Sequence, residues 1–246
     1  MTAKLGAAGA RNLFDPLTIA WESLYWPGGD NFQAEGYTDG QVLNSGETIP
    51  DESPNGNDAT TSQTDLTLTY AASSNVNGKP AVRGASIASG DHPSYANTLA
   101  TGLTSYSVVV VWYQNTILQS FSQIVHDVFD SAVFSLIIAQ DGRLGIGANS
   151  ASNYTAAGTI VSGNTYGFRI NFTPTQATAH LDDSEIFDSV ATMATLNGVK
   201  MFIRNLTSWP FSGDLAFLGV FDGDVAAETE WPSFAQWVSS QFGATI

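Results

Sequence analysis

Tyr106-Ser107-Val108-Val109-Val110-Val111-Trp112-Tyr113 is the stretch that decides the fold, because it is the longest unbroken run of β-branched and aromatic residues in the chain. Residues of these types favour a strand. Four consecutive valines cannot alternate between core and water, so both faces of the strand must be covered, as in an inner strand of a two-sheet sandwich. Eight residues are too few to cross a bilayer as a helix.

Short β-rich runs separated by turn residues supply partners for this strand. They are expected at residues 121–129, 133–139, 143–147 and 166–172. Gln140-Asp141-Gly142-Arg143 has the pattern of a tight hairpin turn between two of them. A second hairpin is expected over residues 178–187, although its tip at Asp182-Asp183-Ser184 lacks the usual glycine.

The C-terminal part predicts a further buried strand and then a helix. In the strand at residues 211–223, Leu215, Phe217, Gly219 and Phe221 alternate with Ala216, Leu218 and Val220, which again indicates two buried faces. The helix is expected to begin after an N-cap at Thr229 and to end at Gly243. One apolar face of this helix is formed by Trp231, Phe234, Trp237 and Val238.

The N-terminal part is less regular. Residues 13–26 are apolar and predict a strand or a short helix, which the periodicity does not separate. Residues 32–52 are expected to be a long surface excursion with one short strand near Val42. Residues 1–12 are expected to form a flexible arm that either stays disordered or orders on a neighbouring subunit, and residues 13–246 a single domain.

Composition excludes several classes of function. The formal charge of −15, with only eight Lys and Arg, argues against binding to nucleic acid or to an anionic membrane, because both need basic patches. The lack of cysteine excludes disulfides, thiolate metal sites and cysteine nucleophiles. Residues 1–10 lack the apolar core of a secretory signal, so we expect no such leader in this sequence.

Three segments in the first third of the chain carry a recognisable order of turns. Residues 38–42 contain an Asp-Gly turn, and residues 77–83 contain an Asn-Gly turn that leads into a strand. Between them lies Pro50-Asp51-Glu52-Ser53-Pro54-Asn55-Gly56-Asn57-Asp58-Ala59-Thr60, in which Asn57 and Asp58 are placed to bond the loop backbone.

In order and spacing, these segments resemble the opening of concanavalin A-like lectin/glucanase domains of the laminin-G-like kind, and residues 211–223 resemble the final core strand of that family. The resemblance implies an all-β, two-sheet antiparallel jelly-roll sandwich with a short C-terminal helix. It covers most of residues 38–243.

No catalytic apparatus is predicted. The strand-borne Glu-x-Asp-x-Glu set of the glucanases in this superfamily is missing, and Asp182-Asp183-Ser184-Glu185 is interpreted as a solvated turn. His92, His126 and His180 are too far apart in sequence to form a recognisable ligand motif. The chain has no Gly-x-Ser-x-Gly elbow and no phosphate-binding loop. We therefore expect a protein that is not an enzyme.

Calcium is the one cofactor that the resemblance brings into question, because many of the resembled domains hold it with loop oxygens. The weak candidates for such a site are Asp39, Asp51, Asn57, Asp58 and Asp91. They form no contiguous calcium-loop pattern, so no metal or cofactor is predicted.

Aromatic residues are candidates for stacking on a sugar ring or for anchoring a protein interface, the alternative for each being ordinary packing. The candidates are Tyr25, Trp26, Tyr37, Tyr95, Trp209 and Phe211. Trp209-Pro210-Phe211 is the most interesting step, because three bulky apolar residues at the start of a strand are hard to bury within one loop.

The resemblance favours a non-enzymatic structural or binding module, similar to domains found in virion structural proteins of tailed bacteriophages. This hypothesis implies a capsid decoration or tail component on the virion surface, with capsid or tail proteins as partners and a homo-oligomeric state. The alternative is a carbohydrate-binding lectin module of a secreted or cell-surface protein, which would take a glycan.

Overall fold

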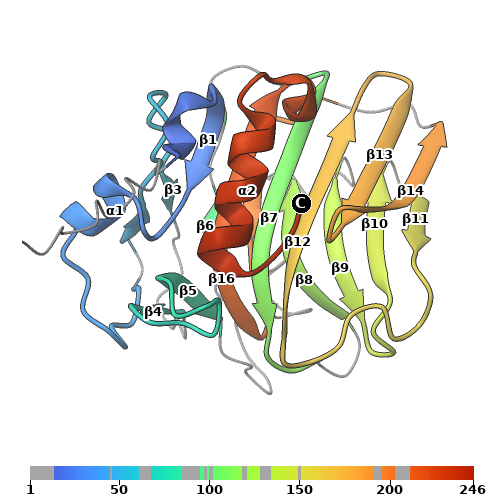
Figure 1. Cartoon of the computed structure of the whole chain (residues 1–246). Helices are drawn as coiled ribbons and strands as arrows, with labels where there is room; N and C mark the ends of the chain where they lie inside the picture. Colours follow the sequence, from blue (N-terminus) through green and yellow to red (C-terminus); the bar gives the residue numbers. More distant parts are fainter. Residues whose placement is uncertain are drawn as a thin grey trace, which may run out of the picture.

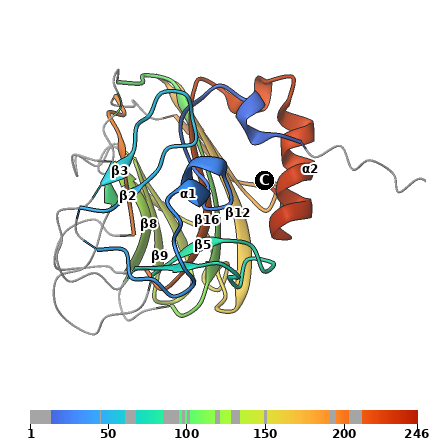
Figure 2. The same ribbon diagram turned by 90° about the vertical axis from the view of Figure 1, so that its left-hand side faces the viewer.

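Two antiparallel sheets packed face to face form the molecule, and helix α2 (Trp231–Phe242) lies on the outer face of one sheet (Figure 1). The structure is a computed structural model that describes residues 14–44, 46–60, 68–84, 95–96, 99, 102–117, 121–127, 134–148, 151–190, 195–202 and 211–246. Seen from the side, helix, first sheet and second sheet follow one another as layers (Figure 2). The expected jelly-roll sandwich with a C-terminal helix is confirmed.

The first sheet, called sheet A, carries the helix. Its strand order is β14-β13-β12-β7-β16-β5-β4, and β1 also pairs with β16. Because β7 lies between β12 and β16, segments more than 50 residues apart in the sequence are neighbours in the sheet. The bounds are β1 (Trp21–Tyr25), β4 (Thr69–Ala71), β5 (Ala81–Gly84), β7 (Tyr106–Gln114), β12 (Asn164–Phe172), β13 (Gln176–Leu181), β14 (Ser184–Val190) and β16 (Gly213–Asp222).

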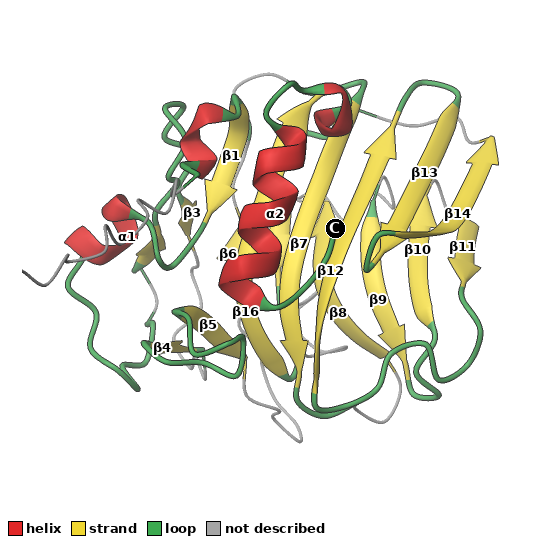
Figure 3. Ribbon diagram, viewed as in Figure 1, coloured by secondary structure: helices red, strands yellow, loops and turns green. Residues whose placement is uncertain are grey.

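The second sheet, called sheet B, has the order β11-β10-β9-β8-β15-β6-β3-β2. Several of its strands are only two to four residues long, and the sequence did not predict them (Figure 3). The bounds are β2 (Thr48–Ile49), β3 (Ala59–Thr60), β6 (Tyr95–Ala96), β8 (Phe121–Asp127), β9 (Ser135–Ala139), β10 (Leu144–Ala148), β11 (Ala151–Tyr154) and β15 (Val199–Met201).

Strand β7 is buried on both faces, as its four valines predict. Val108 and Val110 belong to the core between the two sheets, whereas Val109 and Val111 belong to a second core beneath α2. The cover on the second face is therefore a helix, and the sandwich has three layers at this point.

Strand β16 is also buried on both faces, but the predicted assignment of its residues to faces is wrong at one end. A bulge between Leu215 and Phe217 shifts the register, so Leu215 faces the inter-sheet core and Phe217 faces α2. Because a bulge inserts one extra residue, it reverses the alternation on one side of itself.

Helix α2 packs on sheet A through an aromatic cluster. Phe234 lies with its ring centroid 5.4 Å from those of Trp21 and Phe217. The helix ends at Gly243, which takes the left-handed conformation with φ 71°. Its N-cap is Glu230 and not the predicted Thr229, because Thr229 lies one residue outside the first helical turn.

The turns agree with the sequence. Asn77 and Gly78, at φ 50° and 68°, turn the chain between β4 and β5, and Gly142 does so between β9 and β10. At the β13–β14 tip, Asp182 and Asp183 take φ values of 47° and 64°, so two aspartates fill the left-handed positions that glycine usually occupies.

The N-terminal part contains both elements that its sequence left open. Residues 13–26 include the 3₁₀ helix η1 (Pro16–Thr18) and strand β1, and the expected excursion contains helix α1 (Asp30–Ala34) and a bridge from Val42 to Thr69. A second 3₁₀ helix, η2 (Val225–Ala227), precedes α2. The arm at residues 1–12 lies outside the described residues. No helix in the described ranges is long and apolar enough to span a membrane.

Candidate functional site

The loop at residues 50–60 is built around the carboxylate of Asp51, which is only 2% exposed. One of its oxygens accepts hydrogen bonds from the Leu24 and Ser53 amides at 2.7 and 2.9 Å. The other accepts from the Asn57 amide at 2.8 Å and from the Ser53 hydroxyl at 2.7 Å. Asp51 thus ties the loop to strand β1, and its bonding capacity is used within the chain.

The neighbouring Glu52 is also buried and also structural. Its carboxylate accepts hydrogen bonds from the amides of Asn31 at 3.0 Å and Phe32 at 2.7 Å, in the first turn of α1. Burial raises the pKa of Glu52, and these two hydrogen bonds oppose the increase. Gly29 precedes the helix because a β-carbon there would collide with the Glu52 carboxyl group.

The far end of the same loop is fixed to β1 by its asparagines. The Asn57 side-chain amide donates to the Glu22 carbonyl at 2.7 Å, and that of Asn55 donates to the Trp21 carbonyl at 3.3 Å. The Tyr25 hydroxyl donates to the Asn57 carbonyl. These contacts hold the side chains of Glu22, Asn55 and Asn57 together at one edge of the sandwich.

A polar pocket of about 500 Å³ opens at this edge. Strand β1, the end of β16, the loop at residues 50–60 and the segment 102–104 meet there. Within the described ranges, the side chains of Asp222 and Thr104 make no hydrogen bond, so they remain available to a ligand. The lining residues are Glu22, Asn55, Asn57, Gly102, Leu103, Thr104 and Asp222.

The pocket is chemically suited to a ligand rich in hydroxyl groups. Two carboxylates accept hydrogen bonds, amides both donate and accept, and a threonine hydroxyl does either. Leu103 adds a small apolar contact at 5% exposure. The two carboxylates, in a chain of charge −15, make the pocket unfavourable for an anion.

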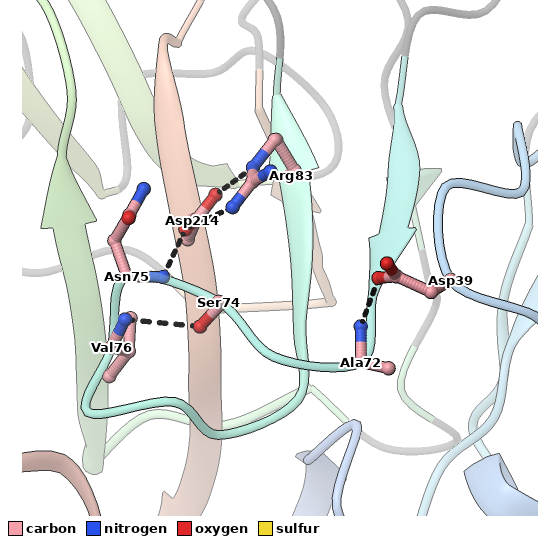
Figure 4. A network of polar contacts seen from close by, with 7 residues as sticks. All are labelled: Asp39, Ala72, Ser74, Asn75, Val76, Arg83 and Asp214. Carbon is pink, nitrogen blue, oxygen red and sulfur yellow. Dashed lines mark hydrogen bonds and ion pairs between the residues drawn. The ribbon is translucent and has the colours of Figure 1, made fainter.

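Polar contacts join Asn75, Arg83 on β5 and Asp214 on β16, and they support the fold (Figure 4). Arg83 on β5 donates two hydrogen bonds, of 2.7 and 3.0 Å, to the carboxylate of Asp214 on β16. The same carboxylate accepts from the Asn75 amide at 2.9 Å. Asp39 accepts from the Ala72 amide at 2.9 Å, which ties the Asp-Gly turn to the same hairpin.

The aromatic candidates do not converge on the pocket. Tyr25 and Phe211 are each 2% exposed, so neither offers a ring face to a sugar. Trp26 packs edge-on against Trp237 of α2, at 5.2 Å between centroids.

Tyr37 is likewise engaged within the chain. It packs on Phe32 at 5.2 Å and donates its hydroxyl to the Thr48 carbonyl at 2.9 Å. Burial, with Glu35 and Glu47 nearby, raises its pKa to about 12. Tyr95 lies in β6, and Trp209 lies outside the described residues.

The calcium candidates are engaged in loop hydrogen bonds. Besides Asp51 and Asp39, Asp58 accepts from the Asp51 amide at 2.8 Å. Asp91 lies outside the described part of the chain. Among the residues that the structure describes, no three His, Asp or Glu side chains are grouped to hold a metal ion.

The sequence missed three of the pocket residues. Glu22, Thr104 and Asp222 are single polar residues in segments far apart in the sequence, and none was a candidate for binding. They meet because β1 pairs with the end of β16, with Trp21 opposite Phe221. Asn57 is the one pocket residue that the sequence offered as a candidate ligand, and it did so for calcium.

No protein-family model matches the chain, and no curated protein sequence matches it. The chain is similar in structure to domain 4 of AbnA, an extracellular arabinanase of family GH43 from Geobacillus stearothermophilus, solved in complex with arabinotriose. The TM-score is 0.55 at 12% identity, covering 82% of this chain and 92% of that domain.

Two further structures show the same fold. One is the botulinum neurotoxin serotype D ligand-binding domain in complex with N-acetylneuraminic acid, with a TM-score of 0.55 at 8% identity over 83% of this chain and 53% of that one. The other is Trypanosoma rangeli sialidase in complex with the inhibitor DANA, with a TM-score of 0.54 at 7% identity, covering 77% and 31%. At these identities the likeness establishes a jelly-roll, lectin-like β-sandwich and nothing finer.

Proposed function

We propose that this chain is a non-catalytic glycan-binding module and that the pocket at Glu22, Asn57, Thr104 and Asp222 is its binding site. The observation that carries the proposal is a rigidly supported pocket whose polar side chains are not all used by the chain itself. Similar folds have been solved with arabinotriose and with a sialic acid, so a saccharide is compatible with this architecture.

The ligand that suits the pocket is a neutral saccharide. Its hydroxyl groups donate to the Glu22 and Asp222 carboxylates and accept from the asparagine amides. Hydrogen bonds to charged groups contribute about 1.5–3 kcal/mol each, so the two carboxylates are the strongest contacts that the pocket offers. An acidic sugar would bring a third negative charge to the same place.

The test is a glycan-array screen, followed by calorimetric titration of the best ligand with Asp222→Asn and Thr104→Val. Both positions are exposed, so the variants should keep the thermal stability of the wild type. We expect Asp222→Asn to weaken binding about tenfold or more, because 1.4 kcal/mol is one decade of affinity. The matched control is Asp188→Asn, an exposed carboxylate on β14. Undiminished affinity in both pocket variants would refute the assignment.

The proposal that the module is non-catalytic is tested by a separate measurement of hydrolysis. Two carboxylates in one pocket are also the usual equipment of a glycosidase. We expect incubation with the bound oligosaccharide to release no reducing ends. Turnover that is lost in Asp222→Asn would show that the chain is a hydrolase acting at this site, and the proposal of a binding module would be wrong.

The role on a virion surface stays a prediction from the sequence. None of the similar structures named above is a virion component by its description. The hypothesis predicts that light scattering shows a defined oligomer. Deletion of residues 1–12 should weaken the association of its subunits and leave the sandwich folded. A concentration-independent monomer would refute it.

A further inference from the structure

A row of ionisable side chains lies on the outer face of sheet A, beside α2. Arg169 on β12 pairs with His180 on β13, and His180 pairs with Glu185 on β14. Directly paired residues of antiparallel strands point to the same face. Val109, the partner of Arg169 on β7, packs beneath α2, so this row lies on the helix side of the sheet.

Arg169 is held in place without an acidic partner. Its guanidinium lies 4.9 Å from the ring centroid of Trp231, the first residue of α2, which is 9% exposed. Within the described ranges, no carboxylate lies within ion-pair distance of Arg169, and its guanidinium donates no hydrogen bond. By contrast, Arg83 and Arg143 each pair with an aspartate.

An arginine without a carboxylate is unexpected in a chain with 23 acidic and eight basic residues. A guanidinium carries five N–H donors, and partial burial makes unmet donors costly. Burial indeed lowers the pKa of Arg169. The described part of the chain supplies no acceptor, so a ligand could do so, and the planar donor fork matches a carboxylate.

His180 adds a second unmet polar group at the same place. Its Nδ1 atom is buried and has no hydrogen-bond partner. Burial and the charge of Arg169 lower the pKa of His180, so the imidazole is neutral at neutral pH and offers one N–H donor.

Carboxylates surround this pair at longer range. The charges of Asp224 and Asp183 oppose the lowering of the Arg169 pKa by burial, and those of Glu185, Asp183 and Asp224 oppose it for His180, whose strand partner is Glu185. They repel a dianion more strongly than a monoanion, and they accept hydrogen bonds from hydroxyl groups. A ligand that combines one carboxylate with several hydroxyls satisfies both conditions.

We propose that Arg169, His180 and Trp231 form a binding site for the carboxylate of a sugar acid of the uronate class. The guanidinium of Arg169 donates two parallel hydrogen bonds to the carboxylate, and the ring of Trp231 fixes the orientation of the guanidinium. The surrounding aspartates and Glu185 receive the sugar hydroxyls. This site shares no residue with the pocket at Asp222 and has the opposite charge preference.

The test is a calorimetric or NMR titration of the full chain with D-glucuronate, acetate and D-glucose. We expect saturable binding of glucuronate, weaker binding of acetate and none of glucose at this site. Arg169→Gln should weaken glucuronate binding at least tenfold, whereas Arg143→Gln, at a position that lines neither site, should leave it unchanged. A failure of the pocket proposal would thus not affect this result.

Arg169→Lys is the control for misfolding, because it keeps the positive charge over Trp231 and removes only the planar guanidinium donors. It should keep the thermal stability of the wild type and weaken glucuronate binding several-fold. The proposal would be overturned by undiminished affinity in Arg169→Lys and Arg169→Gln, by equal affinity for acetate and glucuronate, or by no saturable binding of glucuronate.

Discussion

At the scale of single residues, Asp51 and Asp222 have the same side chain but different roles, because their surroundings differ. Asp51 is buried and accepts four hydrogen bonds from its own chain, so it supports the loop. Asp222 is exposed and lines the pocket, and its side chain makes no hydrogen bond within the described ranges. The first carboxylate serves the fold, and the second is available for recognition.

Glu52 provides a pH-dependent prediction. Its pKa is raised above the ordinary value of 4.5, so the folded chain holds this proton more tightly than the unfolded chain does. Its contribution to stability is therefore complete below about pH 4.5 and is lost as the pH rises through the folded-state pKa. Relative to Glu52→Gln, the wild type should lose unfolding free energy over this range in urea denaturation at a series of pH values. Parallel pH profiles would contradict the assignment.

The ion pair between Arg83 and Asp214 allows a stability comparison. Asp214 is 1% exposed, so Arg83→Ala leaves a buried carboxylate with only the Asn75 amide. Because the Arg83 side chain is 42% exposed, we expect a loss of about 2–3 kcal/mol, below the range for a fully buried pair. Arg143→Ala breaks a pair that is exposed on both sides, and the loss of unfolding free energy should be much smaller. Equal losses in chemical denaturation would refute the distinction.

At the scale of elements, α2 and sheet A form a unit with its own apolar core. The second core joins strands β1, β7 and β16 to the helix and is separate from the core between the sheets. Strand β7 has a second sheet on one side only, and α2 covers its other side. This cover explains why its four consecutive valines are stable in the folded chain. It also positions Trp231 beside Arg169.

Phe234 is the residue at which this unit should be most sensitive. It is fully buried and contacts the rings of Trp21, Phe217 and Trp237. Phe234→Ala should reduce the free energy of unfolding by about 3–5 kcal/mol, the range for removing a buried aromatic side chain. Gln236→Ala, at an exposed position of the same helix, should change it by no more than about 0.5 kcal/mol. A loss below about 1 kcal/mol for Phe234→Ala would show that the helix is not part of the folded core.

At the scale of the whole molecule, hydrogen bonds to aspartate side chains tie the loops at residues 38–42 and 50–60 to the rest of the sandwich. Asp39 and Asp51 each accept a backbone hydrogen bond from another segment, and Asp58 accepts one from within its own loop. Such bonds hold the loops in one conformation, which is the role of a bound cation in a calcium-dependent domain.

We accordingly expect thermal unfolding to be indifferent to calcium. Melting curves recorded in excess calcium chloride and in EDTA should coincide, because a cation that binds only the folded state would raise the midpoint. Magnesium chloride at the same ionic strength is the control for general salt effects. A calcium-specific increase of several degrees would show a site that the described carboxylates do not form.

The sequence by itself determined the elements whose cause is local. The four valines made β7 a buried strand, Asn77-Gly78 and Asp141-Gly142 made tight turns, and the aromatic spacing before Gly243 made α2. These follow from backbone preferences and side-chain periods within a few residues. The jelly-roll class followed from the order of such elements together with the family resemblance.

Only the tertiary structure decided the sites. Glu22, Thr104 and Asp222 face one pocket because distant strands pair in one register, and Arg169 meets Trp231 because α2 folds back onto sheet A. The bulge in β16 likewise reversed a face assignment that alternation alone had suggested. Long-range register depends on the packing of the complete core, and no single segment encodes it.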